Sequence, residues 1–535
     1  PPLPSANPCS LAPPPRRAVI STLAAAGRAG LAPSAAAAQS DPSMAGPGPR
    51  AQQTPRFGFQ DVVRRARELA AAPLAKDQPL PEALEKLDFD AWRDIRFRPD
   101  KAFFNGPFKL QAMHLGHLYR RPVVVNLVRE GIATPIPYAA NLFDYGRTKF
   151  DKAMPVNLGF AGFRLHYPLN DPKVLDELIS FVGASYFRVL GRGQRYGLSA
   201  RALAVSAGTN AEEFPFFREF WIETPEATAD RVVIHGLLDG ASVTGAYRFE
   251  VFPGPEAIIE TTATIFARRP DVKLGLAALT SMYFMGENEQ RKPFDFRREL
   301  HDSDGVLMHT GSGEWLWRPL RNPNVMEISS FMDANPRGFG LMQRDRTFEH
   351  YQDLDLSYEL RPSYWIEPHE GWGEGRVELI ELPTTDETND NIVASWVPKE
   401  PLEPGKPFTY GYRLTSTLNG ANHSPAGRAV NTYLTQARAH GSNEPVVPGT
   451  KRFIIDFAGG DLAFHLANPG AVEVVASSSV GAATRSFVVP NPYIKGFRAA
   501  FDVKVDPGQT ANLRAYLRVG GRPLTETWTY PWRSE

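Results

Sequence analysis

The sequence predicts a mainly β protein, with a large β-sandwich followed by a smaller one. The chain combines 48 Pro and 44 Gly with 11% aromatic residues, which suits many strands and turns better than a helical bundle. Short β-branched or aromatic segments, bounded by Gly, Pro or Asp, recur along its length. Its 535 residues exceed what one hydrophobic core usually serves. We therefore expect two globular domains and a tail.

The start of the chain differs in composition from the rest. Residues 1–55 are rich in Ala, Pro and Gly and contain few large apolar groups, so we expect a tail that is disordered or removed. Residues 16–38 have the charge, the apolar stretch and the small-residue end of a signal peptide. The pair Arg16 and Arg17 indicates twin-arginine export. Arg28 interrupts the apolar stretch, and a plain disordered tail is the alternative.

Helical patterns follow in three places. Apolar spacing predicts a short amphipathic helix from Phe59 and another helical region from Pro81. A third helix is expected over residues 171–190, where Asp171 and Pro172 resemble an N-cap and a first helical residue.

Elsewhere the patterns are those of strands. We assign residues 56–398 to the first domain, with strands over 122–128, 231–238, 247–254, 257–267, 376–383 and 391–398. Residues 399–407, KEPLEPGKP, have the composition of a linker. In residues 408–535, six to seven strand-like segments beginning with FTYGYRLTSTL predict an Ig-like sandwich.

Charge and cysteine content exclude several classes of partner. Lys plus Arg equals Asp plus Glu at 59 each, and no basic stripe indicates nucleic acid or an anionic membrane. No apolar run reaches 18 residues, so we expect no membrane span. The single cysteine, Cys9, lies in the tail, which leaves the remainder without a disulfide or a thiolate metal site. A neutral ligand such as a carbohydrate suits this balance.

Two acid-rich segments about ninety residues apart suggest paired-carboxylate chemistry. HDSDG at 301–305 carries Asp302 and Asp304, and PTTDETNDN at 383–391 carries Glu387 and Asp390. Glycoside hydrolysis needs one carboxylic acid to protonate the leaving oxygen and one carboxylate to activate water or attack the sugar. Both segments could instead form turns, because Asp, Ser, Asn and Gly are the residues that turns favour.

Aromatic and guanidinium side chains lie between the two acid-rich segments. Sugar rings stack on aromatic faces, and the candidate substrate contacts are Trp315, Trp317, Arg346, Tyr351, Trp365 and Trp372. Trp315 and Trp317 alternate, so each faces a different side of a strand and at most one meets sugar. Trp365 and Trp372 could equally be packed corners.

No motif indicates a cofactor or a metal. His114 and His117 are spaced i, i+3 but lack a HExxH pattern, so packing is the expected role. Two glycine pairs, GRG at 191–193 and GSG at 311–313, lack the strand-to-helix context of a nucleotide loop. No GxSxG elbow indicates a serine hydrolase.

Several motifs carry a family resemblance. SYFRVLGRGQRYGLSARALAV, EEFPFFREFW, HDSDG, GEWLWRPL, YELRPSYWIEP and DETNDNIVASWVP resemble the periplasmic glucan biosynthesis proteins OpgG and OpgD, with a lean toward OpgD. The resemblance extends from about residue 57 to the C-terminus. It implies a galactose-mutarotase-like sandwich followed by an Ig-like domain, a periplasmic location and β-1,2-glucan as the substrate.

The resemblance also implies roles for individual residues. Asp390 matches the general acid of an inverting endo-type β-1,2-glucanase, and Asp302 matches its base, which acts directly or through a relay of water and a sugar hydroxyl. Tyr358, Glu387 and Asp304 fall in the supporting polar network. A general acid must stay protonated near neutral pH, so a buried or anion-crowded site should raise the pKa of Asp390, with Glu387 and Asp386 as the expected neighbours.

A different class of function remains open. OpgG-type members could hold glucan without cutting it, as binding or assembly factors for the membrane glucan synthase. The sequence does not determine the oligomeric state, the preferred chain length or the choice between endo and exo cleavage.

Overall fold

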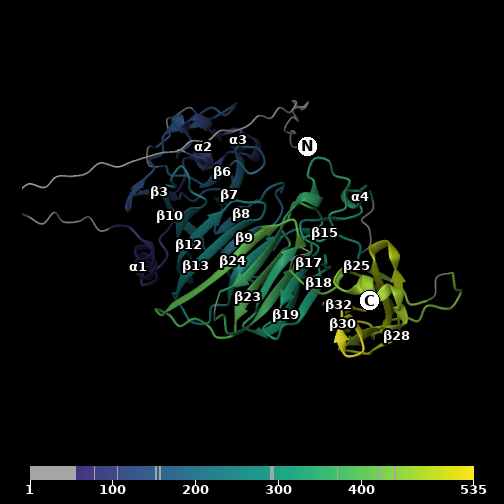
Figure 1. Ribbon diagram of the computed structural model, residues 1–535. Coiled ribbons are helices and arrows are strands. Elements are labelled where there is room, and N and C mark those ends of the chain that lie inside the picture. Colours follow the sequence, from purple (N-terminus) through teal and green to yellow (C-terminus); the bar gives the residue numbers. More distant parts are fainter. Residues whose placement is uncertain are drawn as a thin grey trace, which may run out of the picture. The chain divides into compact units, whose positions relative to one another are not determined.

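The computed structural model describes residues 56–534 apart from 77–78, 105, 151–153, 156–157, 290–293, 370, 421–422 and 439–440. These residues belong to one compact unit (Figure 1). The predicted tail, signal peptide, twin-arginine pair and Cys9 all lie outside the described residues. Among the helices of the described part, none is both long and apolar enough to cross a membrane.

The fold is mainly β, as predicted, and two large sheets dominate it (Figure 1). In spatial order, the first sheet contains β27 (Val472–Ser478), β30 (Thr510–Val519), β32 (Thr527–Arg533), β18 (Trp315–Pro319), β17 (Gly305–His309), β20 (Gly338–Met342), β21 (Ser363–Pro368), β24 (Pro407–Thr417), β13 (Ala257–Ala267), β12 (Val243–Phe252), β11 (Val232–Asp239), β10 (Phe216–Glu223), β3 (Val124–Arg129) and β4 (Ile132–Pro135), with β31 (Arg522–Pro523) beside β30. The second, nine-stranded sheet contains β19 (Glu327–Ala334), β22 (Glu374–Glu381), β23 (Ile392–Pro398), β14 (Leu274–Ser281), β9 (Ser199–Val205), β8 (Tyr186–Val189), β7 (Asp176–Val182), β6 (Gly162–Tyr167) and β2 (Lys109–Met113).

The two large sheets pack face to face through phenylalanine rings. Phe163 of β6 meets Phe220 of β10 with ring centroids 5.0 Å apart, and Phe181 of β7 meets Phe249 of β12 at 5.3 Å. All four rings are buried in one continuous hydrophobic core. Aromatic contacts of this kind add about 0.5–1.5 kcal/mol each beyond the area that they bury. The sheets therefore form one large sandwich.

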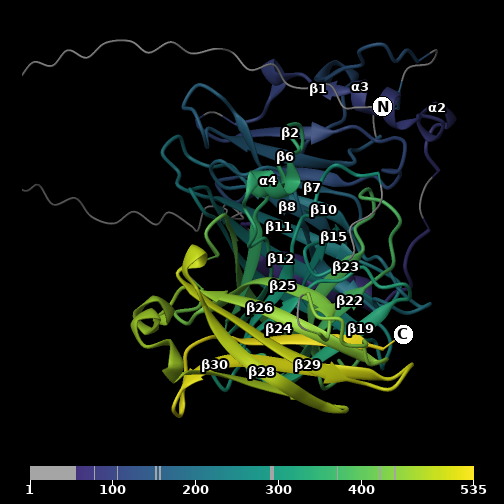
Figure 2. The same cartoon turned by 90° about the vertical axis from the view of Figure 1, so that its right-hand side faces the viewer.

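A smaller sandwich forms at the C-terminal end (Figure 2). One layer is the sheet of β25 (Arg428–Gln436), β26 (Thr450–Ala458), β29 (Gly496–Lys504) and β28 (Ala482–Asn491), and the other is the β27, β30 and β32 end of the first sheet. Phe453 and Phe501 of the four-stranded sheet pack on Trp528 of β32, each with ring centroids 6.0 Å from it. Because β32 pairs with β18, the two sandwiches share a sheet.

The remaining elements are short. Helix α1 (Phe59–Ala70) packs on β11 to β13 through Val62 and Ala66, which confirms the first predicted helix. The others are α2 (Glu82–Glu85), α3 (Phe89–Asp94), α4 (Phe348–Tyr351), the 3₁₀ turns η1 (Pro99–Lys101), η2 (Ala140–Leu142), η3 (Tyr358–Leu360), η5 (Leu462–Ala467), η6 (Pro469–Ala471) and η7 (Pro492–Ile494), and the strand pairs β1 (Arg96–Phe97) with β5 (Phe143–Asp144) and β15 (Tyr283–Met285) with β16 (Leu300–His301).

Two expectations about elements were wrong. The helix predicted over residues 171–190 is replaced by β7 and β8, where Leu178, Ile179 and Phe181 are all buried. A short, continuous apolar run does not distinguish a helix from a strand that is buried on both faces. Residues 408–418, expected as the first strand of the second sandwich, form β24 instead, which pairs with β13 and β21. Tyr410 and Leu414 of this strand enter the core of the large sandwich.

Candidate active site

Asp302 lies in the turn between β16 and β17, with only 4% of its surface exposed. Its backbone N–H donates to the Met282 carbonyl at 2.8 Å, which fixes the turn. The Asp302 carboxylate accepts a hydrogen bond from the Arg361 guanidinium. That guanidinium carbon lies 3.7 Å from the centre of the Tyr358 ring. Asp302 is therefore held against a charged donor that is itself stacked on an aromatic face.

The segment that presents Tyr358 and Arg361 is tightly fixed. Burial raises the pKa of the Tyr358 phenol, so the phenol keeps its proton across the physiological range. Arg346 Nη1 donates to the carbonyls of Glu359 and Arg361 at 2.8 and 2.9 Å. A Cβ at Gly197 would lie only 2.9 Å from Arg361 Cβ, so any larger residue at position 197 would collide with the Arg361 side chain.

Asp390 closes the loop between β22 and β23 and faces a groove with a volume of about 530 Å³. Burial raises the pKa of its carboxyl, Arg188 opposes this by lowering the pKa, and the nearby Asp302 raises it again. The predicted rise in the pKa of Asp390 thus has burial as its main cause, and Asp302 is the anionic neighbour in place of Glu387 or Asp386. Asp390 remains open to solvent, so the carboxyl can be reached although protein surrounds it.

The groove has a polar floor. Arg188 of β8 donates to Ser199 Oγ at 2.7 Å, and Arg164 Nη1 of β6 lies 3.0 Å from Glu177 Oε2 of β7. All four residues line the groove together with Asp390. Guanidinium and carboxylate groups of this kind offer the donors and acceptors that sugar hydroxyls need.

An aromatic pocket of about 480 Å³ adjoins the groove. Tyr119, Gly183 and Tyr186 border both hollows. Phe214 and Phe216 line the part of this pocket that the groove does not share, and Phe214 has 48% of its surface exposed. The two hollows therefore make one continuous surface that is polar at Asp390 and aromatic beyond Tyr186.

The acid loop, residues 382–391, is anchored at both ends. Asn391 has 2% of its surface exposed, and its Oδ1 accepts the Tyr283 N–H at 2.8 Å. Its Nδ2 donates to the carbonyls of Tyr283 and Leu382 at 3.0 and 2.9 Å. At the other end, Asn322 accepts the Thr384 N–H at 2.9 Å and donates to the Thr384 carbonyl at 3.0 Å. Asp390 is therefore presented from a fixed backbone.

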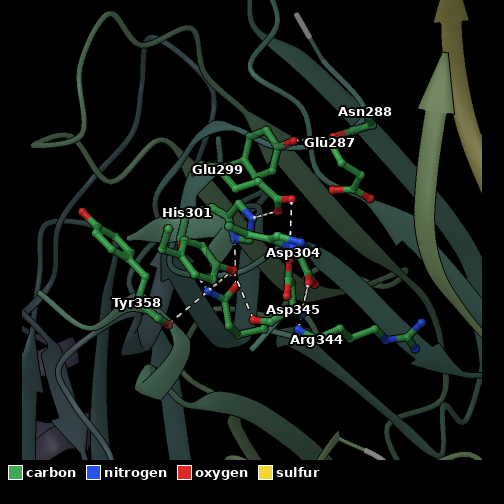
Figure 3. Close-up of polar contacts among 12 residues, drawn as sticks. Glu287, Asn288, Glu299, His301, Asp304, Arg344, Asp345 and Tyr358 are labelled. Atoms are coloured by element: carbon green, nitrogen blue, oxygen red, sulfur yellow. Dashed lines mark hydrogen bonds and ion pairs between the residues drawn. The ribbon is translucent and has the colours of Figure 1, made fainter. Parts of the chain in front are cut away.

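A buried polar network surrounds His301, the residue before Asp302 in the chain (Figure 3). His301 Nε2 lies 3.1 Å from Glu299 Oε2, and its Nδ1 lies 2.8 Å from Gln343 Oε1. Although burial lowers the pKa of His301, the hydrogen bond and ion pair with Glu299 raise it to about 9. Burial, Glu299 and Asp304 together raise the pKa of Glu287 to about 8. Within the network, the positive charge of His301 and the proton held by Glu287 therefore reduce the repulsion among the carboxyl groups.

Asp304 belongs to this network and does not face the groove. Its Oδ2 accepts the backbone N–H groups of Arg344 and Asp345 at 2.8 and 2.9 Å, and burial raises its pKa. The Arg344 side chain extends away from the cluster (Figure 3) and pairs with Glu526 at 2.5 Å, above the Trp317 ring. Asp304 thus shapes the turn that faces the C-terminal sandwich.

Three groups in the network have ligand atoms close enough to share a metal ion. Atoms of Glu299, Asp345 and His350 all lie within 4.8 Å of one another. His350 Nδ1 already faces the Asp345 carboxylate and lies 3.5 Å from Glu299 Oε1, so the imidazole is itself a polar partner of both carboxylates. His114 is buried, with Nε2 3.0 Å from the Tyr138 hydroxyl, in a packing role.

The six predicted sugar contacts lie outside the groove, because none of them is among the described residues that line it or the aromatic pocket. Trp372 is buried in the core of the large sandwich, while Trp317 and Trp365 are buried against the smaller one. Trp315 is half-buried and stacks on His309 with centroids 4.0 Å apart. Tyr351 is fully buried, and Arg346 binds backbone carbonyls.

Sequence reasoning missed the groove's own residues. Tyr186, Arg188 and Ser199 all fall within the motif SYFRVLGRGQRYGLSARALAV, which served only to identify the resemblance. Arg164 and Glu177 lie on strands that sequence reasoning did not identify. The sequence signal that could have found them is the clustering of charged and aromatic residues on consecutive strands. That clustering indicates a site only if the side chains lie on the exposed face of the sheet, which the sequence does not show.

Comparisons with known proteins show which family the chain resembles. The family described as "Periplasmic glucan biosynthesis protein, MdoG" matches residues 57–532. "Glucans biosynthesis protein G" of Ralstonia nicotianae is 46% identical over 492 residues, which covers 90% of this chain and 97% of that protein. "Probable glucans biosynthesis protein D" of Shewanella oneidensis is 43% identical, covering 90% of each chain, and "Glucans biosynthesis protein D" of Xanthomonas axonopodis pv. citri is 44% identical, covering 90% and 91%. Proteins of both the G and the D type thus match at similar identity.

Proposed function

Because this chain belongs to the MdoG family of periplasmic glucan biosynthesis proteins, we propose that it is an inverting endo-type glycoside hydrolase that cuts β-1,2-glucan. Its place of action is the periplasm, where the family functions in the biosynthesis of osmoregulated glucans. Twin-arginine export of the chain is part of the proposal. Of the two types in the family, we propose that this chain has the type D role.

One observation carries the proposal. Asp390 is a carboxyl group that is open to a groove, yet burial and Asp302 raise its pKa. A general acid needs this combination, because it must hold a proton near neutral pH and still reach the glycosidic oxygen. Asp302 differs from it, since its carboxylate is nearly buried and accepts a hydrogen bond from Arg361. Two carboxyl groups in contrasting environments suit the two roles.

The proposed reaction proceeds in one displacement. Asp390 gives its proton to the glycosidic oxygen as the bond from that oxygen to the anomeric carbon breaks. A water molecule attacks the anomeric carbon from the opposite face and loses a proton toward Asp302, directly or through a sugar hydroxyl. The new hydroxyl therefore has the inverted configuration. The phenol of Tyr358 and the Arg361 guanidinium stabilise the groups around Asp302.

A second candidate is a glucan-binding or assembly factor for the membrane synthase. The observation that favours it is the aromatic pocket beside the groove, which could hold a glucan chain without chemistry. In that role the smaller sandwich would contact the synthase.

The test compares products from residues 56–535 of the wild type and of Asp390→Asn incubated with linear β-1,2-glucan. We expect shortening by the wild type and a turnover at least about 100-fold lower in the variant, the scale of losing a general acid. Glu400→Gln, which neutralises an exposed acid after β23, is the control and should keep full turnover. Equal cleavage by Asp390→Asn would reject the residue, and no cleavage by the wild type would favour the binding role.

A further inference from the structure

Arg297 is a shared partner for three carboxylates. It binds Asp295 with two hydrogen bonds, from Nε to Oδ1 at 3.0 Å and from Nη2 to Oδ2 at 2.9 Å. Its Nη1 donates to Asp353 Oδ2 at 3.2 Å, and its Nη2 donates to Glu387 Oε2 at 2.6 Å. The Arg297 side chain is only 14% exposed. One guanidinium thus joins three chain segments at a site shielded from most of the solvent.

Glu387 connects this arginine to the proposed acid. It lies three residues before Asp390 in the acid loop, whose two ends are anchored by Asn391 and Asn322. The ion pair with Arg297 is therefore a separate hold on the middle of the loop. Glu387 is 31% exposed and Asp390 is open to solvent, so few packing contacts would replace that hold.

Asp353 connects the same arginine to the proposed base. Its Oδ1 accepts the backbone N–H groups of Asp355 and Leu356 at 3.1 and 2.9 Å, and its carbonyl accepts the Ser357 N–H at 3.1 Å. Ser357 adopts a left-handed conformation, with φ of 47°, directly before η3. That turn presents Tyr358 and then Arg361, the partner of Asp302. Asp353 therefore fixes the entry to the segment that supports the base.

We propose that Arg297 is a positioning residue that fixes the acid loop relative to the segment that supports the base. This inference rests on the proposed function and adds a residue that touches neither the reacting bond nor either catalytic carboxyl group. Without the guanidinium, three carboxylates would face one another in a poorly solvated site, and their repulsion would separate the segments. Displacement of a catalytic group by about 1 Å can lower turnover about 100-fold.

The experiment uses residues 56–535 and measures kcat and KM on linear β-1,2-glucan. For Arg297→Met we expect kcat to fall about 100-fold with KM changed less than about threefold, because the substrate contacts remain. Arg297→Lys keeps one ion pair but loses the forked geometry, so it should recover part of the loss. Arg298→Met is the matched control, since Arg298 is the exposed neighbour, and it should retain wild-type kcat.

A double-mutant cycle separates positioning from general loss of stability. If Arg297 acts through Asp390, Arg297→Met should lower turnover little further in an Asp390→Asn background. A full additional loss in that background, or a kcat within about threefold of wild type for Arg297→Met, would overturn the inference. If Arg297→Met does not fold, the same double-mutant cycle is measured with Arg297→Lys and Asp390→Asn. A full additional loss of turnover in the Asp390→Asn background would again overturn the inference. Absence of cleavage by the wild type would instead overturn the proposed function, and with it the catalytic role of Arg297.

Discussion

Replacing Asn391 should reveal how firmly the fold holds the acid loop. Its buried side chain makes three hydrogen bonds to backbone groups of Tyr283 and Leu382. Each such bond contributes about 1 kcal/mol, and a buried group left without a partner costs about 1–3 kcal/mol. Asn391→Ala should therefore lower the free energy of unfolding by about 3–5 kcal/mol. Because Asp390 is the adjacent residue, we also expect turnover to fall by roughly 10- to 100-fold.

Urea unfolding followed by tryptophan fluorescence measures the first effect, and steady-state cleavage of β-1,2-glucan measures the second. Asn389→Ala is the control, because Asn389 is exposed in the same loop and its two hydrogen bonds are long, at 3.3 and 3.4 Å. It should change stability by less than about 0.5 kcal/mol. If Asn391→Ala were as stable as Asn389→Ala, the side chain would not be the anchor that its contacts describe.

Two further predictions concern pH and chain length. The acid must be protonated to act, so kcat/KM should be high below the raised pKa of Asp390 and fall as pH rises through it; Arg188→Met removes a charge that lowers this pKa and should move the fall to higher pH. A pH profile that is unchanged in Arg188→Met would contradict this reasoning. If the aromatic pocket holds distant sugar units, Phe214→Ala should raise KM roughly 3- to 10-fold for long glucans, the equivalent of one lost aromatic contact, and leave KM for short oligomers unaltered.

The sequence predicted much of the fold because strand patterns are local. Residues 257–267 and 391–398 read as strands from their β-branched content, and they became β13 and β23. The failures occurred where local patterns were ambiguous. The apolar run before Phe181 suits a helix or a doubly buried strand, and only packing between two sheets selects the strand. The strand β24 was recognised as a strand, but its place between β13 and β21 depends on pairing across some 150 residues.

The candidate site was predictable only in part, for a related physical reason. The acid-rich segments at Asp302 and Asp390 are visible in the chain, and the structure brings both carboxyl groups within electrostatic reach. Their partners are not visible, because Arg188 comes from a strand some 200 residues before Asp390. The tryptophans drew attention for their chemistry, yet Trp372 is enclosed in the core. The residue type predicts which contacts a side chain can make with a substrate, whereas its burial in the fold decides whether a substrate can reach it.

The anomeric form of the first product tests the proposed inversion. Asp302 lies in the turn after β16, where its N–H donates to the Met282 carbonyl just beyond the end of β14, and Asp390 lies two residues before β23, the neighbour of β14 in the nine-stranded sheet. The two acids therefore belong to segments near the same end of the β14 and β23 pair, which agrees with the effect of Asp302 on the pKa of Asp390. Inverting glycosidases hold their carboxyl groups about 6.5–9.5 Å apart, so that a water molecule fits, whereas retaining enzymes hold them about 5–5.5 Å apart. Under the proposed mechanism, proton NMR of the first product formed should detect the α-anomer, because attack of water on the face opposite the leaving group inverts a β-linked anomeric carbon. An initial β-anomer would contradict inversion and indicate a retaining mechanism instead.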